Sequence, residues 1–231
     1  MKIHCFCLPS ICTLRRLHDS FIDLFWPHRC LICGEIIDTR GLCTSCWSSI
    51  HWLNNKSETV FVQGHKKPLK VYAAMGYDAL SKLLFLSLKF KDKTHFASYL
   101  ASILWRRFVH VFAEYYYIVP VPMHFWSRMK RNYNQSVLIA RYLCSHIHDR
   151  KSFAPHILKK IKMTQRQMRL SQAARLRNVR NAFKVCIDIK GAKILLIDDV
   201  MTTGATMYSC ADTLLKAGAS EVVCMVVARV M

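Results

Sequence analysis

Two adjacent carboxylates and a turn rich in hydroxyl groups fall within nine residues of one another in the C-terminal part of the chain. The carboxylates are Asp198 and Asp199, and the turn that follows consists of Thr202, Thr203, Gly204, Ala205 and Thr206. Glycine lets the backbone approach an anion closely, and the free N–H groups and dipole of a helix start attract phosphate. Paired carboxylates can accept hydrogen bonds from ribose hydroxyls and hold the ion that accompanies a pyrophosphate. The pattern therefore indicates a site for a phosphorylated sugar; the alternative is an acidic strand end followed by a capped helix.

The residues on either side of this motif have the pattern of a strand and a helix. Residues 194–197 are four consecutive aliphatic residues, too few for a helix, so they predict a strand buried on both faces of a parallel sheet. Residues 207–217 carry apolar side chains at helical spacing and are followed by Gly218, which is typical of a helix end. This order places the carboxylates at the carboxyl end of a strand, where open α/β sheets bind ligands.

The remainder of this region alternates between strand and helix patterns. The predicted strands are 71–77, 116–121 and 221–228, and the predicted helices are 79–89, 94–111 and 134–146. Such alternation favours an α/β fold with a parallel sheet.

Two cysteine pairs near the N-terminus have the spacing of metal ligands. Cys30 and Cys33 form the first pair, nine residues separate the pairs, and Cys43 and Cys46 form the second. Two such pairs complete a closed tetrahedral site, so we assign a structural zinc; four reduced cysteines in a small loop are the alternative. The total of 11 cysteines is odd, which favours a reducing, cytoplasmic location over a disulfide framework.

The chain is strongly basic. Its 34 Lys and Arg against 14 Asp and Glu give a net charge of +20, which favours phosphate-rich partners: a small phosphorylated substrate, nucleic acid or an anionic membrane surface. Residues 150–187 contain eleven Lys and Arg and no acidic residue, so they could close over a pyrophosphate or form a solvated basic face. Arg128 follows a proline-rich strand end that faces the same ligand edge, whereas His124 fits a catalytic and a structural role equally.

Residues 195–206 resemble the signature of the type I phosphoribosyltransferase family. The resemblance implies a Rossmann-like parallel sheet. It also implies that Asp198 and Asp199 contact the ribose hydroxyls of phosphoribosyl pyrophosphate, that the turn of residues 202–206 holds its 5-phosphate, and that Mg²⁺ accompanies the pyrophosphate.

Nearly the whole chain resembles one branch of that family, the ComF-like competence proteins, which join an N-terminal zinc ribbon to a phosphoribosyltransferase domain. The matching segments are 31–47, 88–90, 119–135, 164–183 and 194–219. Asn132 stands where a glycine is usual, and Lys160 stands where an arginine is common, which would replace a two-pronged phosphate contact by a point charge. Lys160 and Arg175 are therefore added to the expected ligand contacts. Further cysteine pairs of some relatives are absent, so one zinc is expected.

The expected domain organisation has four parts. Residues 1–25 are a leader with an amphipathic helix, 26–54 the zinc ribbon, 55–70 a polar linker, and 71–231 the phosphoribosyltransferase domain. No stretch has the length and low polarity of a stable membrane span.

Two functions of different class follow from the resemblance. The first is an enzyme of DNA uptake and natural transformation that transfers phosphoribose to an acceptor. The second is a non-catalytic adaptor that keeps a phosphoribosyl pocket while binding single-stranded DNA or a DNA-uptake helicase. A general base near the ribose carbon would separate them, and the sequence offers no unambiguous one.

Overall fold

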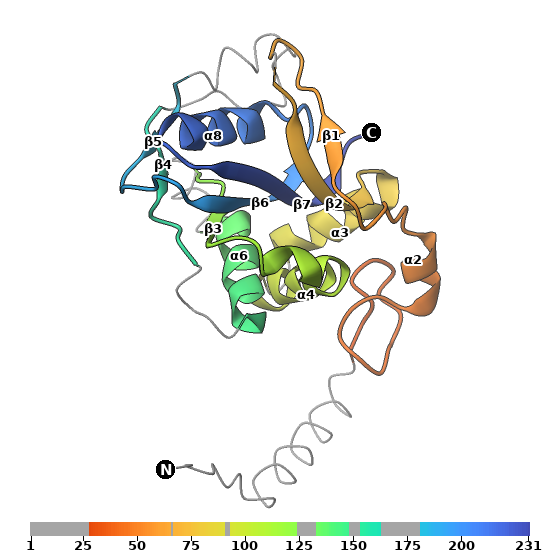
Figure 1. Cartoon of the computed structure of the whole chain (residues 1–231). Coiled ribbons are helices and arrows are strands. Elements are labelled where there is room, and N and C mark those ends of the chain that lie inside the picture. The colour runs from red at the N-terminus through yellow and green to blue at the C-terminus, as the bar shows by residue number, and fades with distance from the viewer. Residues whose placement is uncertain (1–27, 66, 91–92, 124–132, 148–152, 163–180) are drawn as a thin grey trace, which may run out of the picture. The chain divides into compact units, whose positions relative to one another are not determined.

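The structure, a computed structural model, describes residues 28–65, 67–90, 93–123, 133–147, 153–162 and 181–231 (Figure 1). The chain divides into two compact units, Met1–Ser49 and Ile50–Met231. Each unit is described by itself below.

The larger unit is built on a five-stranded sheet with the strand order β1-β2-β7-β6-β3. These strands are β1 Glu58–Val60, β2 Leu69–Gly76, β3 Tyr117–Pro120, β6 Lys193–Met201 and β7 Glu221–Arg229. The pairs β2–β7, β7–β6 and β6–β3 are parallel, and β1 pairs antiparallel with β2 at the edge. A separate two-stranded antiparallel sheet joins β4 (Leu158–Lys160) to β5 (Phe183–Val185).

Helices cover both faces of the main sheet (Figure 1). One face carries α3 (Ala79–Phe90), α4 (Lys93–Phe112) and α6 (Gln135–His146), and the other carries α8 (Ala205–Lys216). The strand β6 lies between these layers, which explains why residues 194–197 are fully buried and why all four are aliphatic. Among the described helices, none combines the length and the low polarity that crossing a membrane requires.

The predicted α/β fold with a parallel sheet is confirmed, and two segments differ from the expectation. The strand β6 does not end at the acidic pair: its ladder with β7 continues through Asp198↔Val226 to Met201↔Arg229. Residues 55–70, expected to be a linker, include the short edge strand β1, although the sequence of this segment is polar. Pairing with β2 and a 2.6 Å ion pair between Glu58 and Arg229 of β7 hold this strand in place.

Candidate phosphate-binding site and metal centre

The four predicted zinc ligands lie together in the smaller unit. The Sγ atoms of Cys30, Cys33, Cys43 and Cys46 all fall within 4.8 Å of one another, and those of Cys33 and Cys43 are 3.7 Å apart. A tetrahedral zinc with Zn–S bonds of about 2.3 Å requires S···S separations of roughly 3.8 Å. The thiols therefore have the spacing that zinc requires, with every position of a tetrahedron filled by protein.

Backbone N–H groups donate hydrogen bonds to two of these thiols. The N–H of Cys43 points to Sγ of Cys30 and that of Cys46 to Sγ of Cys43, both at 3.4 Å. Burial raises the pKa of Cys30, but backbone hydrogen bonds, chiefly from Cys43, outweigh burial and lower this pKa to about 6. Burial and the neighbouring thiols raise the pKa of Cys46. Four thiolates cannot be charged side by side without a cation, so the cluster fits a structural zinc.

Removing two ligands is expected to remove the metal. In the Cys33→Ser/Cys46→Ser variant, we expect elemental analysis to show zinc falling from about one equivalent to near zero, with loss of folded structure in residues 28–49. The metal supplies most of the stability of so small a unit, since structural zinc binding contributes roughly 10–16 kcal/mol. Cys186→Ser is the matched control, because Cys186 is an exposed free thiol outside the cluster. Full zinc retention in the double variant would remove the assignment.

In the larger unit, Asp198 is held by two hydrogen bonds to the same oxygen. Its Oδ1 accepts from the Ser136 hydroxyl at 2.7 Å and from the Asp199 N–H at 3.0 Å. A cavity of about 120 Å³ lies beside it, lined by Asp198 and residues 200–207. The structure thus brings together one predicted carboxylate and the whole predicted turn. Asp199 does not line this cavity, and its Oδ1 accepts from the N–H of Val200 at 2.7 Å.

The pKa of Asp198 is raised well above the ordinary value. Burial is the main cause, and the neighbouring Asp199 carboxylate adds to it, while the Ser136 hydrogen bond opposes the shift. Burial disfavours the ionised form of the Asp198 carboxylate in the free protein. Such a carboxylate is suited to a ligand that supplies hydroxyl donors or positive charge.

The turn between β6 and α8 has two features of an anion site. Gly204 caps the helix with φ +75° and has no side chain that could cover the first N–H groups of α8, which are the groups that attract an anion at a helix start. The Thr203 hydroxyl is buried and has no hydrogen-bond partner among the described residues. Buried hydroxyls are almost always paired, so this one points to a missing acceptor.

The structure shows a second reason for glycine at position 204. A Cβ on Gly204 would lie 2.6 Å from Cε of Met201 and 2.9 Å from Cγ2 of Val62. The absence of a side chain at Gly204 therefore leaves space for the side chains of Met201 and Val62.

Residues 97–231 match the model of the phosphoribosyl transferase domain. The chain belongs to this family. Residues 21–57 match a second model, the double zinc ribbon domain, which contains the four clustered cysteines. The predicted family and the predicted zinc ribbon are both confirmed.

Several curated relatives are similar to this phosphoribosyl transferase family member. DNA utilization protein YhgH of Escherichia coli O157:H7 is 30% identical over 61% of this chain and 63% of its own length. Competence protein F of Haemophilus influenzae is 32% identical over 46% of each chain, and competence protein ComFC of Bacillus subtilis is 25% identical over 83% of this chain and 73% of its own. The chain thus spans less than two thirds of the YhgH relative.

Among solved structures, phosphoribosylpyrophosphate synthetase from Mycobacterium smegmatis is 14% identical, with a TM-score of 0.35 over 69% of this chain and 40% of that chain. The fold assignment rests on the family match and on the strand order of the sheet.

Of the basic residues expected at the phosphoribosyl transferase site, Lys160 lies in the described part. It ends β4, is partly buried, and its Nζ is 5.7 Å from the centre of the Phe183 ring. Burial lowers the pKa of Lys160, and the nearby Asp198 carboxylate acts in the opposite direction. The structure therefore brings Lys160 into the electrostatic surroundings of Asp198. His124, Arg128 and Arg175 lie outside the described residues.

Ser136 is a site residue that the sequence did not reveal. It opens α6, whose N-cap Asn134 accepts from the Ser136 N–H at 3.1 Å and donates to the Val121 carbonyl at 3.0 Å. This anchors the start of α6 to the end of β3 and aims Ser136 at Asp198, 62 residues away. The available signal was a serine near the start of a predicted helix. That position does not indicate which residue the serine contacts. The contact between the turn after β1 and α8 was also not predicted. The His65 ring stacks on the Tyr208 ring of α8, with the ring centroids 3.5 Å apart.

The raised pKa of Asp198 predicts a stability gain in Asp198→Asn. The folded protein keeps this proton over a pH range in which the unfolded chain has lost it, so the free energy of unfolding falls as pH rises between the two pKa values. Asparagine removes that loss and can still accept the Ser136 hydrogen bond. We expect a melting temperature above wild type at about pH 8, converging at about pH 4, with each pKa unit contributing about 1.4 kcal/mol. Thermal unfolding without magnesium measures it.

The exposed Asp212, paired with Lys216, supplies the matched control for this experiment. Asp212→Asn should change stability by less than about 0.5 kcal/mol at either pH. A difference between Asp198→Asn and wild type that does not depend on pH would contradict the assigned burial of this carboxylate.

Proposed function

We propose that the larger unit binds phosphoribosyl pyrophosphate, or a related 5-phosphoribosyl ligand, together with Mg²⁺. The observation that carries the proposal is the buried hydroxyl of Thr203, a residue of the cavity lining, which has no hydrogen-bond partner in the part of the chain that the structure describes. A phosphate oxygen in the cavity would complete its hydrogen bonding. Membership of the phosphoribosyl transferase family supports the same ligand class.

The turn and the carboxylates would bind different parts of the ligand. The N–H groups at Gly204 and Ala205 and the hydroxyls of Thr202, Thr203 and Thr206 would hold the 5-phosphate at the positive end of α8. The Asp198 carboxylate would accept a ribose hydroxyl, and Asp199 would accept a second one. Carboxylate oxygens are also the ligand type that Mg²⁺ prefers, and the ion would neutralise charge on the pyrophosphate.

Basic side chains would complete the pyrophosphate end of the site. Lys160 supports this assignment because its charge interacts with the Asp198 carboxylate. We assign Arg128 and Arg175 to the same role from the sequence pattern. An ammonium that is partly desolvated binds phosphate more strongly than one in bulk water, since the local dielectric is lower.

We place the protein in DNA uptake in the cytoplasm, with single-stranded DNA and an uptake helicase as proposed partners. The names of the relatives refer to DNA utilization and competence. The net charge of +20 favours a nucleic-acid partner, and the eight cysteines of the described residues are all free thiols, which suits a reducing compartment.

A release assay separates the enzyme from the adaptor. Pyrophosphate release from phosphoribosyl pyrophosphate, screened with nucleobases, ammonia and DNA ends, identifies turnover and its acceptor. Binding by calorimetry with no release under any of these conditions assigns the non-catalytic adaptor. No binding with or without Mg²⁺ would remove the proposed function.

Thr203→Val tests the observation on which the proposal rests. The substitution keeps the shape of the side chain but removes the unpaired hydroxyl, so stability should stay constant or rise. Binding of phosphoribosyl pyrophosphate should weaken about tenfold or more, because hydrogen bonds to charged groups contribute roughly 1.5–3 kcal/mol. Calorimetry and thermal unfolding on the same samples provide both values.

Thr213→Val is the control, because the Thr213 hydroxyl in α8 already donates to the Ser209 carbonyl at 2.7 Å. It should lose a little stability and keep full affinity. The proposal for Thr203 is wrong if both variants behave alike.

A further inference from the structure

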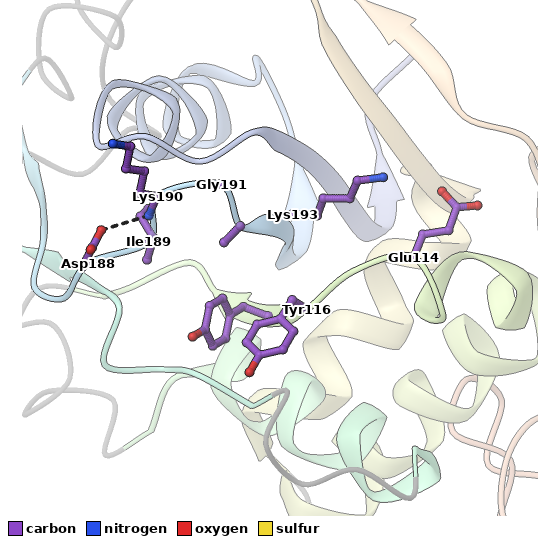
Figure 2. A pocket seen from close by; sticks show the side chains of 9 residues that line it. Glu114, Tyr116, Asp188, Ile189, Lys190, Gly191 and Lys193 are labelled. Atoms are coloured by element: carbon purple, nitrogen blue, oxygen red, sulfur yellow. Dashed lines mark hydrogen bonds between the residues drawn. The ribbon is translucent and has the colours of Figure 1, made fainter.

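A second hollow lies at the opposite end of the sheet from Asp198. It has a volume of about 380 Å³ and is lined by the amino ends of β3 and β6 and by the turn of residues 188–192 that precedes β6 (Figure 2). The strand β6 runs from Lys193 at this hollow toward Asp198, so the two sites are separated by roughly 16 Å of extended chain. They share no lining residue.

An exposed aromatic ring forms one wall of this hollow. Tyr116 is 63% exposed, although large aromatic side chains are usually buried. Its ring meets that of Tyr117 edge to face with centroids 4.6 Å apart, and its N–H donates to the Lys193 carbonyl at 3.1 Å. The Tyr116 ring therefore packs against Tyr117 and remains largely exposed. Exposed, fixed aromatic rings of this kind stack on nucleobases.

Charged groups of both signs stand at the ends of the hollow. Figure 2 shows Lys193 and Glu114 at one end and Asp188 and Lys190 at the other. Lys193 is half-exposed and its Nζ is 3.8 Å from Glu221, a carboxylate that Lys70 also approaches at 3.9 Å. Two ammonium groups thus share the Glu221 carboxylate, so Lys193 is not held in a one-to-one ion pair.

These groups match the parts of one ligand. A ring face suits a nucleobase, an ammonium suits a phosphate, and a carboxylate such as Glu114 accepts hydrogen bonds from sugar hydroxyls or exocyclic amines. The volume lies within the range of small-molecule sites. We propose that this hollow binds a nucleoside monophosphate unit, with the base on Tyr116 and the phosphate at Lys193. The unit can come from a free nucleotide or from a single-stranded DNA chain, and the site is independent of phosphoribosyl binding.

Calorimetry on the zinc-loaded full chain tests the proposal with deoxyadenosine monophosphate, deoxyadenosine and a short 5′-phosphorylated deoxyadenosine oligonucleotide. We expect the monophosphate to bind more tightly than the nucleoside. Tyr116→Ala should weaken binding about tenfold or more, since stacking on an aromatic ring accounts for such a loss, and Tyr116→Phe should keep it. Lys193→Ala should remove the advantage of the monophosphate over the nucleoside. Both positions are exposed, so folding should be unaffected.

Two controls identify the site and the source of the ligand. Lys216→Ala removes an exposed ammonium from α8, away from the hollow, and should change nothing. Asp198→Asn, or saturation with phosphoribosyl pyrophosphate, should also leave this binding intact. Equal affinity for the monophosphate and the oligonucleotide identifies a free nucleotide as the ligand, and much tighter oligonucleotide binding with the same response to Tyr116→Ala identifies the strand. Undetectable binding of all three probes overturns the proposal, as does a loss in Lys216→Ala equal to that in Lys193→Ala.

Discussion

Replacing Asp198 and Asp199 together by asparagine is expected to weaken binding of phosphoribosyl pyrophosphate by roughly two orders of magnitude or more. Each anionic acceptor becomes a neutral amide, and hydrogen bonds to charged groups contribute roughly 1.5–3 kcal/mol each. Ribose hydroxyls and magnesium both favour the ionised carboxylates, which burial disfavours in the free protein. Calorimetry with and without Mg²⁺ measures the loss.

The variant should fold, because asparagine keeps the size of the side chain and its oxygen can accept from Ser136 and from the Asp199 backbone. Zinc content should also be unchanged, since the cysteine cluster belongs to the other unit. Asp212→Asn, which removes an exposed carboxylate from α8, should bind as wild type does. Equal affinity of the double variant and wild type, with zinc intact, would show that the acidic pair has no part in ligand binding.

Gly204→Val is expected to abolish binding by a different route. A side chain here must tolerate φ +75° and must also displace Met201 and Val62, which approach within 3 Å of the added Cβ. The turn can accept valine only by moving, and that moves the N–H groups at the start of α8 away from the phosphate. We expect no measurable affinity for phosphoribosyl pyrophosphate and a lower melting temperature.

The alanine variants of two glycines separate backbone strain from the contact. Gly191 has the same φ of +75°, but a Cβ there would meet nothing within 4 Å. Gly191→Ala should lose about 1–2 kcal/mol of stability and keep full affinity for phosphoribosyl pyrophosphate, whereas Gly204→Ala should lose more stability and also lose affinity. If Gly204→Val bound as tightly as wild type, the turn would be only a capped helix start.

Features encoded by neighbouring residues could be predicted from the sequence. The strand at 194–197 followed from an unbroken aliphatic run, because only a strand covered on both faces needs apolar side chains on both sides. The helix after Gly204 and the helix capped by Asn134 followed from apolar spacing and turn chemistry. The cysteine cluster followed from two pairs whose spacing lets each pair hold one ion.

The ends of elements were predicted less well. The strand β6 continues through the acidic pair because β7 offers backbone partners as far as Arg229, and that pairing is not visible in β6 itself. Similarly, Glu58–Val60 has a polar sequence typical of a loop, yet the free edge of β2 and the guanidinium of Arg229 make it a strand.

The sequence by itself determined the residues that carry the predicted chemistry: the cysteine set of the zinc ribbon, the acidic pair, and the turn proposed to bind phosphate. The residues of each set lie close together along the chain. Only the tertiary structure decided which groups act on them from a distance. Ser136 reaches Asp198 across 62 residues, Val62 explains the glycine at 204, and Tyr116 and Lys193 meet at the far end of the sheet. The physical reason is that parallel strands connected by helices bring distant segments to a common edge, and such contacts leave no periodic or spacing signal in the sequence.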